Sequence, residues 1–157
     1  MGVEDWEAVK KIYEEGIATG NATVETDAPA WDRWNTSHRL DCRLVAKDRD
    51  QVIGWAALSP VSVRDAYSGV AEVSVYVAEH FRGNGAGKLL LDSLVSSSES
   101  AGVWTLQSMI FVDNEASIAL HASCGFRPVG IRERIGCLYG HWRDTLLMES
   151  RSNITGS

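Results

Sequence analysis

Residues 82–88 have the composition of an anion-binding loop. Gly83, Gly85 and Gly87 alternate with other residues at the junction between a predicted strand and a predicted helix. Glycine lets backbone amides approach a ligand closely, and a helix start presents free N–H groups and the positive end of the helix dipole. The spacing therefore predicts a phosphate cradle with a cation at each end, made of Arg82, Gly83, Asn84, Gly85, Ala86, Gly87 and Lys88.

Two familiar phosphate-binding patterns do not fit this loop. A kinase-type P-loop would need glycine at position 82 and Ser or Thr at position 89, where the chain has Arg82 and Leu89. A dinucleotide-binding loop would need a third glycine where the chain has Lys88. The remaining alternative is a tight turn that only caps the following helix.

Two residues outside the loop could move protons. Glu72 is a carboxylate in an otherwise apolar predicted strand, and alternation places it on one face with Ser74 and Tyr76. A carboxylate in an apolar strand costs free energy unless it takes part in chemistry or in an ion pair. The alternative to a general base is therefore a strand residue that is exposed or in an ion pair. His121 lies two helical turns after Asn114 and could donate or relay a proton. Its alternative is a helix histidine hydrogen-bonded in a polar groove.

Arg64 and Tyr67 lie in the loop before the strand that carries Glu72. Arginine binds carboxylate and phosphinate groups through paired hydrogen bonds, so Arg64 could hold an acceptor while Tyr67 packs on its methylenes. The alternatives are a solvated arginine and an aromatic anchor for the loop. Residues 141–144 could line the far wall of a site, although we expect Trp142 in the core.

Metal chemistry is not expected. His121 and Cys124 are three residues apart on one predicted helix, which could supply half a site. No second pair has ligand spacing.

Periodicity in the sequence predicts strands mixed with helices in one layered unit, an α/β or α+β fold. Apolar residues at helical spacing predict four helices, beginning near residues 4, 31, 88 and 114. β-Branched and alternating runs predict six strands at 42–46, 52–58, 71–77, 106–112, 127–134 and 142–149. Hairpin-linked strands at both ends and a strand–helix–strand unit in the middle indicate a mixed sheet.

Composition excludes several classes of protein. The 157 residues are enough for one domain with its own core, and 45% of them are apolar. The formal net charge of −6 argues against a general nucleic-acid binder. No apolar run approaches the roughly 20 residues of a membrane span. Three scattered cysteines and an acidic start without a signal-peptide pattern predict a cytoplasmic protein.

Two segments resemble the signatures of the GCN5-related N-acetyltransferase (GNAT) superfamily. The glycine loop, which follows Val75-Tyr76-Val77, is similar to the acetyl-CoA loop Arg/Gln-x-x-Gly-x-Gly/Ala. Asn114, followed by a helix and Gly125-Phe126, is similar to the second signature. Further segments resemble the phosphinothricin and methionine sulfoximine acetyltransferase group, namely Arg64-x-Ala66-Tyr67, residues 71–77, Leu120-His121 and residues 140–144.

The resemblance covers nearly the whole chain and implies the GNAT fold, an α/β (α+β) fold whose twisted mixed sheet is flanked by about four helices. One domain would span residues 1–150, followed by a polar C-terminal tail at 151–157. The family's first strand is expected to be short or missing, because the helical pattern already begins by Glu4.

The resemblance also implies a role for each site residue. Acetyl-CoA would be the co-substrate, with its pyrophosphate on the amides of residues 82–88. Its pantetheine arm would run beside Val75, Tyr76 and Val77, and Asn114 and Ser117 would lie near the thioester. Glu72 would be the general base, and His121 stands where many members have the tyrosine that protonates the thiolate.

These roles predict an N-acetyltransferase that acts by direct attack on the free amine of a small amino-acid-like molecule, as in herbicide or antibiotic detoxification. The alternatives are a peptide or protein N-acetyltransferase and a non-catalytic acyl-CoA-binding module on the same fold. We expect a small-molecule amine as partner and no nucleic acid or membrane, and the resemblance is compatible with a homodimer.

Overall fold

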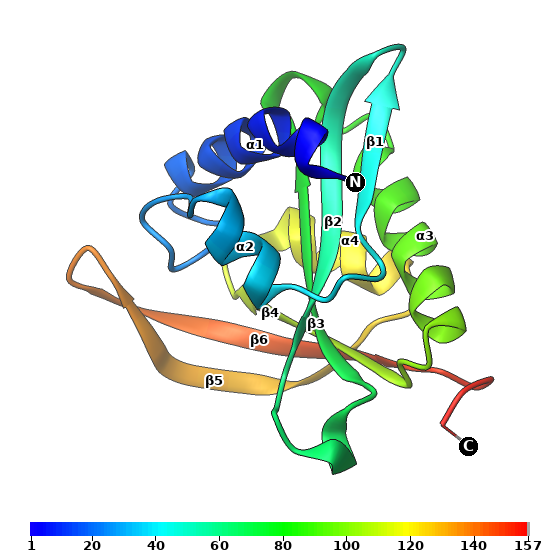
Figure 1. Cartoon of the computed structure of the whole chain (residues 1–157). Helices are drawn as coiled ribbons and strands as arrows, with labels where there is room; N and C mark the ends of the chain where they lie inside the picture. The colour runs from blue at the N-terminus through cyan, green and yellow to red at the C-terminus, as the bar shows by residue number, and fades with distance from the viewer. Residues whose placement is uncertain (157) are drawn as a thin grey trace.

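Six strands form one mixed sheet in the order β1-β2-β3-β4-β6-β5 (Figure 1). Neighbouring strands are antiparallel, except β3 and β4, which are parallel. The computed structural model describes residues 1–156. The strands are β1 (Leu44–Asp48), β2 (Gln51–Pro60), β3 (Val70–Val77), β4 (Thr105–Phe111), β5 (Arg127–Leu138) and β6 (His141–Arg151). The mixed sheet expected from the sequence is confirmed.

Helices α1 (Trp6–Ala18) and α2 (Trp31–Ser37) cover one face of the first three strands (Figure 1). Trp6, Val9 and Ile12 recur on one side of α1 and are buried there. They form a cluster with Trp34 of α2 and Trp55 of β2, which is rich in aromatic ring contacts. Burial of these large side chains holds α1 and α2 on the sheet.

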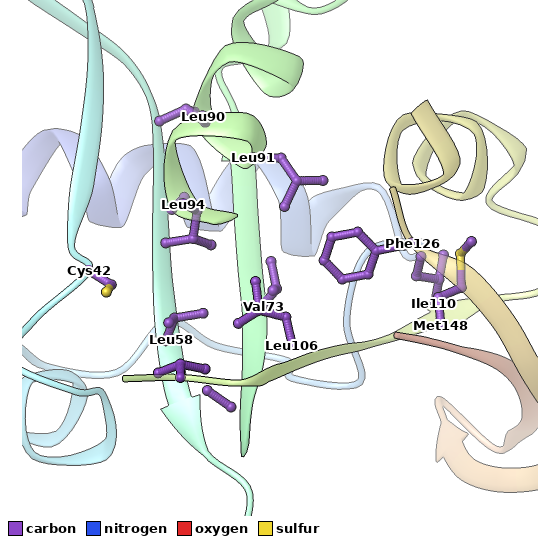
Figure 2. Close-up of a cluster of buried hydrophobic side chains, with 13 residues drawn as sticks. Cys42, Leu58, Val73, Leu90, Leu91, Leu94, Leu106, Ile110, Phe126 and Met148 are labelled. Carbon is purple, nitrogen blue, oxygen red and sulfur yellow. The ribbon is translucent and has the colours of Figure 1, made fainter. Parts of the chain in front are cut away.

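Helices α3 (Ala86–Ser100) and α4 (Glu115–Ser123) lie on the opposite face (Figure 1). Leu90, Leu91 and Leu94 of α3 point toward Leu58 of β2 and Val73 of β3 (Figure 2). The same cluster continues to β4, β6 and the end of α4 through Leu106, Ile110, Phe126 and Met148. Four α-helices within residues 1–156 agree with the number expected.

No strand precedes α1 within residues 1–156, as expected for a first strand that is short or missing. Residues Val3–Asp5 form a single turn of 3-10 helix instead. The ammonium group of Met1 donates to the carbonyl of Arg43, 3.3 Å away and just before β1. The first residues therefore lie beside the start of the edge strand β1.

Two expectations about the last hairpin are wrong. Trp142 is 62% exposed rather than part of the core, because it lies at the end of the β5–β6 hairpin opposite the exposed Cys137. The hairpin reaches away from the helices there (Figure 1). Strand β5 also continues to Leu138, past the expected end at 134. The ladder is irregular between Arg132 and Gly136, and Arg134 has a positive φ of 49°, which interrupts the period-2 pattern.

The beginning of the polar tail is tied back to the body of the protein. Arg151 is still part of β6, and its guanidinium donates to the carbonyls of Trp104 and Thr155 at 3.0 Å each. The hydroxyl of Ser152 donates to Glu99 of α3 at 2.7 Å. Ser157, the last residue of the expected tail, lies outside the described residues.

No helix in the described part of the chain combines the length and the apolar character of a membrane span.

Candidate active site

The parallel strands β3 and β4 pair over only three residues and then separate. Val70–Glu72 pair with Thr105–Gln107, whereas β2 stays paired with β3 as far as Val77. Residues 73–77 of β3 thus have β2 on one edge and, within residues 1–156, no strand on the other. Backbone donors and acceptors on this free edge need partners. The edge could pair with an extended ligand that carries amides, and it contains Val75, Tyr76 and Val77.

The glycine loop lies directly beyond the free edge of β3, at the start of α3 (Figure 1). Gly83 and Gly85 have φ of +79° and +89°, which L side chains rarely adopt. Gly85 is the N-cap of α3, and the first bond within the helix is from Leu89 N to Gly85 O at 3.0 Å. The amides of Ala86, Gly87 and Lys88 therefore point out of the helix end and are free to bind an anion.

The packing at Gly87 explains why α3 can begin so close to the split, the region where β3 and β4 separate. A Cβ at this position would lie 3.2 Å from Leu120 Cδ2 of α4 and 3.6 Å from Val77 Cγ2 of β3. Nothing lies within 4 Å of a Cβ built on Gly83 or Gly85, so that side of the loop is open. An open loop, free helix amides and positive φ together fit the pyrophosphate of a nucleotide-type ligand.

The polar side chains of the loop are held locally. Arg82 Nε donates to the Val77 carbonyl at 3.1 Å, and Asn84 Nδ2 is 3.3 Å from the Arg82 carbonyl. Lys88 forms an exposed ion pair with Asp92, one turn further along α3, at 2.8 Å. This hydrogen bond raises the pKa of Lys88 and lowers that of Asp92. The Lys88 side chain is exposed, and Asp92 is its ion-pair partner.

Glu72 is the last paired residue of β3 at the split. Its Oε2 accepts a hydrogen bond from Gln107 Nε2 at 2.9 Å, across the parallel ladder. Alternation places Glu72 on the face of β3 that also carries Tyr76, which packs in the α1 cluster. Residues 73, 75 and 77 face α3 instead. The single amide bond orients the carboxylate and leaves Oε1 without a partner among the described residues.

Asn114 is the N-cap of α4. Its Oδ1 accepts from the Ser117 amide at 3.2 Å, and its Nδ2 donates to the Asn21 carbonyl at 3.0 Å. The side chain thus joins the start of α4 to the connection between α1 and α2. Each polar group makes one hydrogen bond, so Oδ1 keeps a second lone pair and Nδ2 a second N–H for a ligand.

His121 is buried in α4, with only 2% of its surface exposed. Its Nδ1 lies 2.7 Å from the Ser117 carbonyl, which can only accept, so Nδ1 carries a proton. Burial lowers the pKa of His121 and keeps the ring neutral near pH 7. Nε2 is therefore an acceptor, and it has no hydrogen-bond partner among residues 1–156.

The structure brings some of the expected residues together and not others. Glu72, the free edge of β3, the glycine loop and the start of α4 surround the split between β3 and β4. Glu72 and His121 approach it from opposite faces of the sheet, and no hydrogen bond joins them. Arg64 and Tyr67 lie on the β2–β3 connection, where Tyr67 is 49% exposed. Their side chains contact neither Glu72 nor each other through a hydrogen bond in residues 1–156.

One polar residue of the site, Gln107, which orients Glu72, was not found from the sequence. Arg143 of β6 lies in the segment 141–144 that was considered for the far wall of the site, but its partners were not foreseen. It donates to the Gly20 carbonyl at 2.8 Å and to Asn21 Oδ1 at 2.9 Å. Arg143 also pairs with Asp113 at 3.0 Å and lies over the ring of Phe111. The sequence carried no signal for these contacts, because Gln107 lies 35 residues from Glu72, and Arg143 lies more than 120 residues from Gly20 and Asn21.

No group of three or more potential metal ligands is present in the part of the chain that the structure describes.

A mixed sheet that splits between parallel strands, with a glycine loop at a helix start beside the split, defines an acyl-CoA-dependent transferase. The family model described as Acetyltransferase (GNAT) family matches residues 6–126. The chain belongs to this family, and it is an acetyl-CoA-dependent N-acetyltransferase.

Named relatives support the same assignment. The chain is 32% identical to phosphinothricin N-acetyltransferase of Alcaligenes faecalis, over 96% of this chain and 79% of that protein. It is 31% identical to L-methionine sulfoximine/L-methionine sulfone acetyltransferase of Pseudomonas paraeruginosa, over 99% of this chain and 94% of that protein. A crystal structure of a phosphinothricin acetyltransferase from Sinorhizobium meliloti in complex with acetyl-CoA has a TM-score of 0.89 and 31% identity. The match covers 99% of this chain and 88% of that one.

Proposed function

We propose that the chain acetylates the free amine of a small, carboxylated, amino-acid-like acceptor of the phosphinothricin or methionine sulfoximine type. Glu72 acts as general base, and His121 assists. The observation that carries the proposal is the position of Glu72, a carboxylate oriented by Gln107 at the point where β3 and β4 separate. The names of the relatives support the class of acceptor.

Acetyl-CoA supplies the acetyl group as a thioester. The acceptor nitrogen bonds to the carbonyl carbon, the C–S bond breaks, and the thiolate leaves with the electron pair. The nitrogen must be neutral to attack, but most amines of this kind are protonated at neutral pH. Glu72 takes the proton, directly or through a water molecule.

His121 assists as a proton acceptor in this proposal. With its proton on Nδ1, the neutral ring offers only the Nε2 lone pair. It can receive a proton from the amine side and can protonate the thiolate only after that. Its burial means that the acceptor or a water molecule must enter the split before Nε2 is reached.

The cofactor-binding residues are proposed from the same geometry. The amides of residues 82–88 hold the pyrophosphate, with Arg82 and Lys88 adding positive charge. The free edge at Val75, Tyr76 and Val77 pairs with the pantetheine amides. Asn114 binds this arm near the thioester, and Ser117 lies beside it.

For the acceptor, we propose that Arg64 binds the carboxylate and that Tyr67 packs on the carbon chain. Both side chains are exposed next to the start of β3, five to eight residues before Glu72.

Thiol release tests the function directly. We expect release from acetyl-CoA when phosphinothricin or methionine sulfoximine is added, and only background release without an acceptor. Activity on peptides but not on free amino acids would select the peptide N-acetyltransferase alternative. Binding of acetyl-CoA with no transfer to any amine would select the non-catalytic module.

We also propose a homodimer. The edge strand β5 leaves one edge unpaired within residues 1–156, and Val129 and Ile131 on it are 47% and 62% exposed. Such an edge is open to a second copy. Light scattering should give twice the 17.2 kDa of one chain, and a monomeric mass would contradict the proposal. A cytoplasmic location and a single domain over 1–150 remain predictions.

A further inference from the structure

Strands β3, β4, β6 and β5 carry a row of polar side chains on the face opposite α3 and α4. Glu72 pairs with Gln107, Gln107 with Glu149, and Glu149 with Arg127. Residues paired across strands lie on the same face of a sheet. Glu72, the general base of the proposed function, therefore shares one face with side chains of the β5–β6 hairpin.

The ladder places Arg127, Arg143 and Arg151 on this face beside Arg132, and each of these three has partners inside the protein. Arg127 forms an ion pair with Glu149. Arg143 pairs with Asp113 at 3.0 Å and also bonds to the connection between α1 and α2. Arg127 and Arg143 thus have carboxylate partners inside the protein, and Arg151 donates to the carbonyls of Trp104 and Thr155.

Arg132 has no such partner. Within residues 1–156 it forms no ion pair and no hydrogen bond to an oxygen, and its only polar contact is from Nη1 to the thioether sulfur of Met109, 3.4 Å away. The side chain thus reaches from β5 across β6 to β4. Thr145 lies between Arg132 and Phe111 in the ladder, is buried, and has a hydroxyl without a hydrogen-bond partner. This part of the face carries one uncompensated positive charge and one unsatisfied hydroxyl.

The contact with Met109 places the guanidinium of Arg132 near β4, two residues beyond the partner of Glu72. Glu72 is paired with Gln107, and Met109 is two residues further along β4. Strand spacing and rise place the Cα atoms of Glu72 and Met109 about 8 Å apart. A ligand that contacts both Glu72 and Arg132 must have several bonds between its amine and its anionic group.

We propose that Arg132 binds the acidic side-chain group of the acceptor, such as a phosphinate, while Glu72 receives the proton of its amine. This inference rests on the proposed function above. In phosphinothricin, three carbons separate the amine nitrogen from phosphorus, whereas one carbon separates it from the carboxylate. Two anchor points on separate strands suit the phosphinate, the anion that lies further from the amine, better than the α-carboxylate. A guanidinium binds the two phosphinate oxygens side by side.

Substitution of Arg132 tests this assignment with two acceptors. We expect Arg132→Gln to raise the KM for phosphinothricin at least tenfold and to leave the KM for methionine sulfone, whose side chain is uncharged, within twofold. The values of kcat and the KM for acetyl-CoA should stay unchanged for both acceptors. Arg132→Lys, which keeps the charge but loses the paired geometry, should fall in between. Arg127→Gln on the same strand is the matched control and should change neither KM.

Calorimetric titration of phosphinothricin, in the presence of coenzyme A, gives a readout that does not need turnover. We expect wild type to bind at least tenfold more tightly than Arg132→Gln. Equal affinities, or an equal rise in KM for both acceptors, would overturn the role of Arg132 and leave the proposed function intact. If wild type acetylates neither acceptor but still binds phosphinothricin through Arg132, the acceptor class of the proposed function fails and the subsite stands.

Discussion

Replacement of Glu72 by Gln should abolish most of the activity at neutral pH without disturbing the fold. Glutamine has the same shape as glutamate, and its Oε1 can still accept the 2.9 Å hydrogen bond from Gln107. The site therefore keeps its geometry and loses only the group that takes a proton. General-base catalysis is worth about 10²- to 10⁴-fold, so we expect kcat/KM to fall by that factor at pH 7.

The loss should shrink as the pH rises. An acceptor amine with a pKa one to two units above the assay pH is about 1–10% neutral in solution. Raising the pH to the pKa of the amine supplies the neutral form without a base, so the deficit of Glu72→Gln should narrow by about tenfold for each pH unit. We would measure thiol release from pH 6.5 to 9.5 with saturating acetyl-CoA.

Glu149→Gln is the matched control, since it makes the same change to a carboxylate on the same face of the sheet. Its kcat should stay within twofold of wild type. Both variants should unfold within a few degrees of wild type and bind acetyl-CoA equally. A Glu72→Gln protein with wild-type kcat at pH 7 would refute Glu72 as the base, and a constant deficit at all pH values would assign it to positioning instead.

Three further changes have definite expected outcomes. Gly85→Ala puts a side chain at a φ of +89°, which costs about 1–2 kcal/mol, and should raise the KM for acetyl-CoA about tenfold. Gly130→Ala is the control and should leave this KM unchanged. Equal KM values for the two variants would contradict a role for the loop. Arg143→Met leaves the Gly20 carbonyl and Asn21 Oδ1 without their charged donor, and should lower the free energy of unfolding in urea by about 2 kcal/mol; an unchanged midpoint would count against the link. Burial lowers the pKa of His121, so the unfolded state binds a proton more readily and stability falls as the pH drops below about 6.5. His121→Phe should therefore flatten the loss of thermal stability between pH 7 and 5, and an unaltered slope would disprove the link.

Local sequence patterns were sufficient to predict the helices and strands of this fold. The leucines of α3 and the alternation of β3 define which face is buried, because periodicity is a property of neighbouring residues. The glycine loop was found in the same way, since its chemistry resides in seven consecutive residues. The strand β5 was underestimated because a positive φ at Arg134 interrupts its alternation.

Contacts between segments that are distant in the chain could not be predicted from the sequence. Gln107 could be assigned to Glu72 only once the register of β3 and β4 was known. The neutral state of His121 depends on burial by other elements, and the exposure of Trp142 depends on how far the hairpin extends beyond the helices. The apolar character of a large side chain does not by itself predict whether the fold buries it.

The short pairing of β3 with β4 also bears on how stability depends on the ligand. Only three residue pairs of parallel ladder join the β1–β3 half of the sheet to the β4–β6–β5 half. A ligand whose amides pair with residues 73–77 would act as an additional strand and lock the two halves together. At a hundredfold excess over Kd, binding to the folded state alone adds about 2.7 kcal/mol to the free energy of unfolding. The slowing of amide hydrogen exchange should then be largest along β3, so the resistance of this enzyme to unfolding should rise with the concentration of acetyl-CoA.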